Sequence, residues 1–87
     1  VRTAYYLRMR AVDRPGVLAD ITRILADQEI SIDAMIQKEP DEGQEQVDII
    51  ILTHETVEKN INQAIAKIEG LPTIPGKVTR LRLETLG

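Results

Sequence analysis

The chain has 87 residues, with no cysteine, tryptophan or phenylalanine, two tyrosines and one histidine. A chain of this length forms one domain, and the lack of cysteine excludes disulfides, thiolate metal sites and cysteine nucleophiles. Eleven lysines and arginines against fourteen aspartates and glutamates give a net charge of −3. An acidic balance with so few aromatic residues is unlike a nucleic-acid-binding module, and the composition as a whole disfavours an independent enzyme.

The first strand is expected over residues 5–12, where Tyr5, Leu7, Met9 and Ala11 alternate with their neighbours at a period of two.

Residues 13–16, Asp-Arg-Pro-Gly, end this strand pattern. Asp13 is expected to cap the next helix, with Pro15 in its first turn, where a missing N–H is harmless. The helix itself is predicted from Val17 to about Gln28 by apolar residues at helical spacing.

Residues 30–37 alternate again and predict a second strand, followed by a hairpin-type turn at residues 39–44, which contain proline, glycine and acids. The third strand is predicted from Val47 to Thr53. Its apolar residues are consecutive, so we expect it to be central and covered on both faces.

The second helix is predicted over residues 57–68, with Thr56 as its cap and Gly70 as its stop. After a connection at residues 71–76, a last strand is expected from Val78 to about Glu84, with leucines facing one way and arginines the other.

The predicted order is β-α-β-β-α-β, which folds as a ferredoxin-like α+β sandwich with four antiparallel strands and two helices on one face. The second face of the sheet has no helix to cover it. We therefore expect Ile50 or its neighbours, with Met35, to contact another subunit.

The segment at residues 12–18, at the junction of the first strand and the first helix, is also the strongest candidate site. The free N–H groups of a helix start attract a carboxylate, and Gly16 has no side chain to keep a ligand from the backbone. Asp13 could accept a hydrogen bond from an ammonium group, so the segment offers what a free α-amino acid needs. The alternative is that Asp13 only caps the helix and Gly16 only permits close packing.

Residues 13–18, Asp-Arg-Pro-Gly-Val-Leu, followed by residues 29–33, Glu-Ile-Ser-Ile-Asp, resemble the ACT domain, a regulatory module of the same βαββαβ order that commonly binds an amino acid and pairs with a second copy. More narrowly, residues 5–8, 32–38, 52–54 and 78–82 resemble the C-terminal ACT domain of homoserine dehydrogenases.

The resemblance implies an effector at a dimer interface, between the first loop of one chain and the second strand of its neighbour. The residues it assigns to effector binding are Asp13, Pro15, Gly16, Val17 and Leu18, with Ser31 and Ile32 from the neighbour.

Serine-sensing relatives carry asparagine, histidine and asparagine where this chain has Asp13, Ala11 and Ser31. These differences disfavour serine, and feedback on homoserine dehydrogenase points to threonine or a related amino acid. The resemblance also implies an upstream catalytic domain that would bind NAD(P), with no catalytic residue, cofactor or metal in this domain.

Other features have weaker functional interpretations. His54 is expected to be a surface or capping residue, and an acidic run could attract a divalent cation but is more typical of a solvated hairpin. Arg8, Arg10, Arg80 and Arg82 are expected on one sheet face, where they could bind phosphate or pair with acids of the parent enzyme. The acidic run consists of Glu39, Asp41, Glu42, Glu45 and Asp48.

The alternatives to a regulatory module are a purely structural dimerisation module, an ACT domain of another enzyme of amino-acid metabolism, and an RNA-recognition-like module. The last would need aromatic residues on the central strands, where this chain has arginines and aliphatic residues.

We expect residues 1–87 to be a single domain cut from a longer polypeptide, because the chain begins with Val1 and not methionine. No signal peptide is visible, and the longest uninterrupted apolar run, residues 49–52, is far short of the about 20 residues that span a bilayer. A cytoplasmic location is therefore expected.

Overall fold

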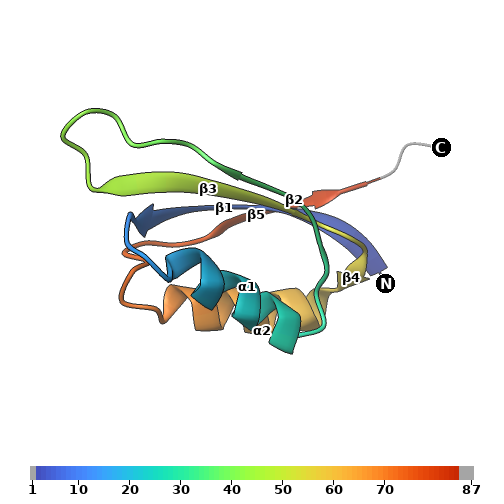
Figure 1. Ribbon diagram of the computed structural model, residues 1–87. Helices are drawn as coiled ribbons and strands as arrows, with labels where there is room; N and C mark the ends of the chain where they lie inside the picture. Colours follow the sequence, from blue (N-terminus) through green and yellow to red (C-terminus); the bar gives the residue numbers. More distant parts are fainter. Residues whose placement is uncertain (1, 85–87) are drawn as a thin grey trace.

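The computed structural model describes residues 2–84, which form five strands and two helices (Figure 1). In chain order these are β1 (Arg2–Val12), α1 (Val17–Asp27), β2 (Ile32–Gln37), β3 (Gln46–Thr53), β4 (Thr56–Val57), α2 (Glu58–Glu69) and β5 (Thr79–Leu83). The predicted βαββαβ order is confirmed, with the two-residue β4 added before α2.

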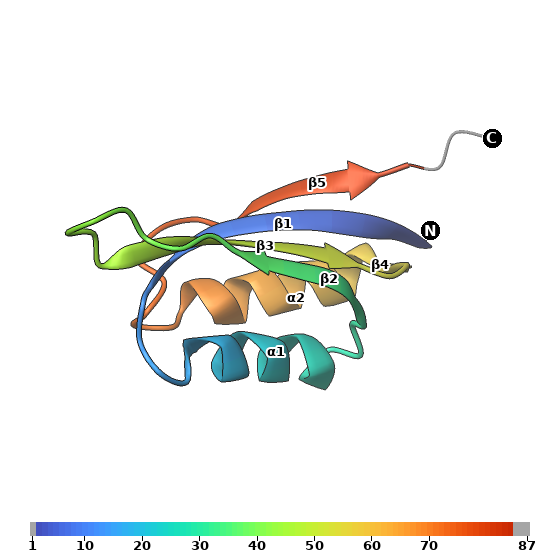
Figure 2. The same ribbon diagram turned by 45° about the horizontal axis from the view of Figure 1, so that its top comes forward.

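The sheet is antiparallel, and β1 lies at its centre between β3 and β5, with β2 on the far side of β3. β4 pairs only with the beginning of β1, where Arg2 lies opposite Val57. Both helices lie against the same face of the sheet (Figures 1 and 2). This is the predicted ferredoxin-like α+β sandwich.

The core lies between the sheet and the helices and is almost entirely aliphatic. In β3, Val47, Ile49 and Ile51 are fully buried, whereas Ile50 and Leu52 between them are only partly buried. The expectation that β3 is covered on both faces is therefore wrong for this chain. Its run of apolar residues supplies the core with one set of side chains and leaves the other set on the second face.

The face of the sheet without helices is called the open face. Because residues directly opposite each other in a ladder share a face, the registers assign to it the following side chains: Tyr6, Arg8 and Arg10 of β1, Ala34 and Ile36 of β2, Asp48, Ile50 and Leu52 of β3, and Leu81 and Leu83 of β5.

The expected grouping of Met35 with Ile50 is wrong. Met35 lies opposite Ile51, on the helix side, and Ile36 is the residue opposite Ile50. A shift of register between Ile32 and Ala34 separates the two parts of this ladder, and a pairing change of one residue reverses which side chains share a face.

Neither predicted N-cap is observed. The N-cap of α1 is Gly16, and Asp13 lies three residues earlier, outside the helix. Thr56 belongs to β4, and Val57 is the N-cap of α2, without a side-chain hydrogen bond. Gly70 is the C-cap of α2, as predicted.

The end of α1 is closed by backbone hydrogen bonds around Glu29, which has a left-handed φ of 59°. The Ile30 N–H donates to the Leu25 carbonyl at 2.9 Å, and the Glu29 N–H donates to the Ala26 carbonyl at 2.9 Å. This is the pattern of a Schellman motif, in which the left-handed position is usually glycine.

Replacing Glu29 with glycine is therefore expected to raise the free energy of unfolding by about 0.5–1 kcal/mol, because glycine adopts positive φ without a Cβ clash. Urea denaturation measures the change. Gln28→Gly is the matched control: Gln28 has a φ of −93°, so glycine there should lower stability. A loss of stability in Glu29→Gly would contradict the expected strain.

Within residues 2–84, no helix is long and apolar enough to cross a membrane.

Candidate functional site

The β1–α1 loop, residues 13–16, is fixed at its base by two backbone hydrogen bonds. The Val12 N–H donates to the Thr73 carbonyl at 2.8 Å, and the Asp13 N–H donates to the Glu45 carbonyl at 2.8 Å. The loop is thus held to the connection before β5 on one side and to the β2–β3 hairpin on the other. Asp13 itself is exposed, and its carboxylate has no ion-pair partner among residues 2–84.

The start of α1, which follows Asp13 by three residues at its N-cap Gly16, presents free backbone donors. The Asp20 N–H reaches the Gly16 carbonyl at 3.0 Å, and the Val17 N–H reaches the Arg14 carbonyl at 3.3 Å. Between them, the N–H groups of Leu18 and Ala19 have no acceptor within the described residues, as at any helix start that lacks a side-chain cap. These donors suit a carboxylate.

Gly16 shapes the approach to these donors. Its φ is 89°, and a Cβ built on it would meet nothing within 4 Å. The backbone conformation therefore requires glycine at this position. The alternative that Gly16 only permits close packing is wrong, because no atom lies close to its Cβ position. The space beside it is open to a ligand.

Gly16→Ala is expected to lower the free energy of unfolding by about 1 kcal/mol, because an L residue is strained in the left-handed region. Gly76→Ala is the matched control, because Gly76 also has open space around its Cβ position but no positive φ. Thermal unfolding of both variants tests this, and equal melting temperatures would contradict it.

The other residues expected at the site differ in what they can offer. Pro15 is exposed beside Gly16, and Leu18 is partly buried. The Val17 side chain is part of the core, at 5% exposure, so only its backbone could face a ligand. Ser31 is exposed and Ile32 is half-buried, at the start of β2.

Within one chain the predicted site is divided in two. The loop lies at the beginning of α1, whereas Ser31 and Ile32 follow its end (Figure 2). The helix has 11 residues and is therefore about 16 Å long at ~1.5 Å per residue. A single amino acid cannot bridge this length, so one chain presents two half-sites and encloses neither.

The second half-site is tied to the end of β3. The His54 N–H donates to the Ser31 carbonyl at 2.9 Å, and the His54 Nε2 lies 3.6 Å from the Asp33 Oδ1, with both side chains 59% exposed. His54 is thus a surface residue, as expected, and it forms a solvent-exposed pair with Asp33.

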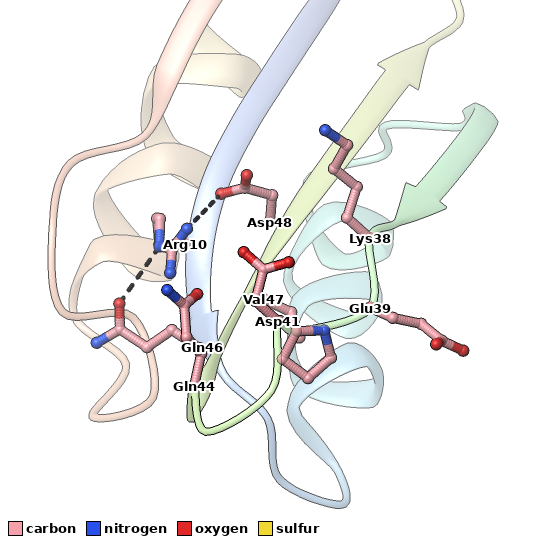
Figure 3. A pocket seen from close by; sticks show the side chains of 9 residues that line it. Arg10, Lys38, Glu39, Asp41, Gln44, Gln46, Val47 and Asp48 are labelled. Carbon is pink, nitrogen blue, oxygen red and sulfur yellow. Dashed lines mark hydrogen bonds and ion pairs between the residues drawn. The ribbon is translucent and has the colours of Figure 1, made fainter.

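A separate hollow of about 350 Å³ lies where the β2–β3 hairpin meets the open face (Figure 3). None of the residues predicted for effector binding lines it. Its polar and charged lining residues are Arg10, Lys38, Glu39, Asp41, Gln44, Gln46 and Asp48. Three members of the acidic run thus lie around it, but the described residues contain no group of three side chains arranged to hold a metal ion.

The four arginines expected on one face are divided between the two faces, because Arg80 and Arg82 lie opposite the buried residues Leu7 and Tyr5. Arg80 accordingly pairs with Glu58 of α2 at 3.5 Å. Arg8 and Arg10 lie on the open face, where both bind Asp48 at 3.2 Å. β1 and β5 are neighbours as predicted, but their register places these arginines on opposite sides.

The sheet order, the paired helices and the loop at the start of α1 define the class of the protein. The ACT domain family model matches residues 5–72, and the chain belongs to this family. The ACT domain of a GTP pyrophosphokinase from Chlorobium tepidum has the same fold, with a TM-score of 0.74 at 14% identity over 93% of this chain and 100% of that one.

More closely similar relatives are homoserine dehydrogenases, as the longer sequence pattern predicted. The enzyme of Methylobacillus glycogenes is 73% identical over 86 residues, which are 99% of this chain and 21% of that protein. The enzyme of Pseudomonas aeruginosa is 45% identical over 97% of this chain and 19% of its own length. A solved homoserine dehydrogenase from Thiobacillus denitrificans has a TM-score of 0.89 at 71% identity, covering 100% of this chain and 19% of that one. The chain thus spans about a fifth of the length of these relatives.

Proposed function

We propose that this chain is the C-terminal regulatory domain of a homoserine dehydrogenase and binds an amino-acid effector, with threonine as the first candidate. The observation that carries the proposal is that one loop and the helix start after it hold an exposed Asp13 carboxylate without an ion-pair partner in residues 2–84, free N–H groups at Leu18 and Ala19, and open space at Gly16. An α-carboxylate would accept from the N–H groups, and the α-ammonium would donate to Asp13.

The division into two half-sites supports binding between two copies. In the proposed pair, the loop of one chain meets Ser31 and Ile32 of its neighbour. β2 is an edge strand of the sheet, and side-by-side pairing through such an edge would satisfy its free backbone groups.

The enzyme activity belongs to the part of the polypeptide outside this chain. There, hydride transfer between a nicotinamide cofactor and homoserine or aspartate semialdehyde would serve threonine and methionine biosynthesis in the cytoplasm. Effector binding would favour one relative arrangement of two domains, and a coupling of about 1–3 kcal/mol would change the affinity of the catalytic part for its own ligand about 5- to 150-fold.

Isothermal titration calorimetry and thermal shift with threonine, isoleucine, methionine, lysine and serine test the proposal. We expect heat and a raised melting temperature with threonine. The titrations are made at a chain concentration at which sedimentation shows the dimer, and no response there to any of the five would exclude an amino-acid effector at this site.

The second candidate function is a structural dimerisation module, which the unsatisfied edge of β2 also favours. It predicts an oligomer in sedimentation velocity that no amino acid perturbs. The proposed effector domain instead predicts that threonine shifts the population toward the dimer.

A further inference from the structure

The connection between α2 and β5, residues 70–78, is closed at its two ends by one side chain. Glu69, the last residue of α2, accepts a hydrogen bond from the Val78 N–H on its Oε2 at 2.7 Å. Its Oε1 lies 3.8 Å from the Lys77 Nζ. A hydrogen bond from a backbone N–H to a carboxylate is stronger than one between neutral groups. The Glu69 carboxylate thus joins the end of the helix to the residue before β5.

Between its ends, the α2–β5 connection packs on the core and contacts the end of β1 (Figures 1 and 2). The Ile74 and Val78 side chains are buried in the core, and the Ile74 N–H donates to the Leu71 carbonyl at 3.1 Å in a turn. The Thr73 carbonyl in this turn accepts from the Val12 N–H at 2.8 Å. The connection therefore supports the base of the β1–α1 loop through Thr73.

The Thr73 side chain does not stabilise this position. Its Oγ1 is buried and has no hydrogen-bond partner among residues 2–84, and a buried hydroxyl without a partner is unfavourable. The position of Thr73 is therefore imposed by the rest of the connection, which is fixed by the buried Ile74 and by the Glu69 carboxylate at its ends.

Glu69 occupies a place in α2 that is unfavourable for a carboxylate. It directly precedes the C-cap Gly70, where the helix dipole disfavours negative charge. Alanine also has a higher helix propensity than glutamate. If Glu69 were only a surface residue of the helix, Glu69→Ala would therefore leave the structure unchanged or stabilise it. The hydrogen bond to the Val78 N–H is the contact that offsets the unfavourable charge.

We propose that Glu69 is a positioning residue of the effector site. Its carboxylate closes the α2–β5 connection, and the closed connection holds the Thr73 carbonyl against the Val12 N–H. This contact fixes the base of the loop at residues 13–16, which carries the proposed ammonium and carboxylate ligands. The positioning role rests on the effector site proposed above, but the contacts that Glu69 supports require no effector.

Amide hydrogen exchange, followed residue by residue by NMR without effector, tests these contacts. In Glu69→Ala the Val12 N–H should exchange at least tenfold faster than in the unchanged chain, because its acceptor is no longer held in place. The Asp13 N–H is the internal reference, because it donates to the Glu45 carbonyl of the hairpin at 2.8 Å and should change less than threefold. Equal acceleration at both amides, or none at Val12, would overturn the proposal.

Two further variants separate the hydrogen bond from the charge. Glu69→Gln keeps an acceptor oxygen and should return Val12 exchange to within threefold of the unchanged chain. Lys77→Ala removes an ion-pair partner that is 91% exposed and should leave Val12 exchange unaltered. Failure of Glu69→Gln to restore protection would overturn the role of the hydrogen bond, and acceleration in Lys77→Ala as large as in Glu69→Ala would overturn it in favour of the ion pair.

Calorimetry with threonine, under the conditions of the titrations above, links these contacts to the effector site. We expect a Kd at least fivefold higher in Glu69→Ala, and within twofold of the unchanged chain in Glu69→Gln. Faster exchange at Val12 with an unaltered Kd would overturn the positioning role. No heat from the unchanged chain would overturn the effector site and the role that rests on it, even where exchange confirms the contacts, so the two failures are distinguishable.

Discussion

Asp13→Ala is expected to weaken threonine binding at least tenfold. A hydrogen bond to a charged group contributes about 1.5–3 kcal/mol, and 1.4 kcal/mol is about a tenfold change in affinity. The exposed carboxylate has no protein partner within residues 2–84 that could compete for the ammonium. Calorimetry of the variant measures the loss directly.

Two further variants test whether the effect comes from the charge of Asp13, from its acceptor oxygen, or from the net charge of the chain. Asp13→Asn keeps an acceptor oxygen and should weaken binding less than alanine. Glu42→Ala removes the same charge from the exposed hairpin and should leave the affinity unchanged. An unaltered affinity in Asp13→Ala would reject the placement of the ammonium at this residue.

The largest loss of stability is expected from Leu7→Ala. Leu7 is fully buried at the centre of β1, between β3 and β5, and truncation of such a residue costs about 2–5 kcal/mol. A domain of 87 residues has only about 4–13 kcal/mol at ~0.05–0.15 kcal/mol per residue. The melting temperature should therefore fall by more than about 10 °C.

Leu81→Ala is the matched control for this loss. The same atoms are removed from the neighbouring strand, on the open face, where Leu81 is 57% exposed. We expect a change within about 1 kcal/mol in the isolated chain. A loss as large as that of Leu7→Ala would mean that the open face is already covered in solution by a second copy.

Sequence periodicity predicted the order and type of the six main elements, because hydrophobic spacing reflects which side chains reach a core. It predicted Gly70 at the end of α2 but not how either end of α1 is capped, nor the N-cap of α2. At α1 the capping residue is a left-handed Gly16, and at its C-terminus Glu29 adopts a conformation that its sequence does not favour. In both places the backbone conformation determines how the helix ends. Side-chain preferences predicted the wrong N-cap, Asp13, and gave no indication of the left-handed Glu29.

The register of the sheet could not be predicted from the sequence either. Alternation alone does not show which set of side chains faces the helices. From alternation we expect Met35 on the same face as Ile50, and all four arginines of β1 and β5 on one face. The irregularity between Ile32 and Ala34 reverses the first grouping, and the pairing of β5 with β1 reverses the second. Asp48, which holds Arg8 and Arg10 together, appeared in the sequence only as one acid of a run.

For the candidate site, the segment at residues 12–18 was predicted from residue chemistry, whereas Ser31 and Ile32 entered only through the family resemblance. Their separation from the loop by the length of α1 explains this difference. No local pattern can reveal a contact that exists only between two chains.

The position of the two half-sites at opposite ends of α1 has a thermodynamic consequence. In the proposed pair, effector affinity and domain association are linked, so each must strengthen the other by the same factor. An isolated chain at low concentration would then be almost insensitive to threonine, whereas a chain tethered within an oligomeric enzyme would respond at the effective concentration that its linker sets. Loss of feedback could therefore arise from substitutions along the edge of β2 that never touch the amino acid.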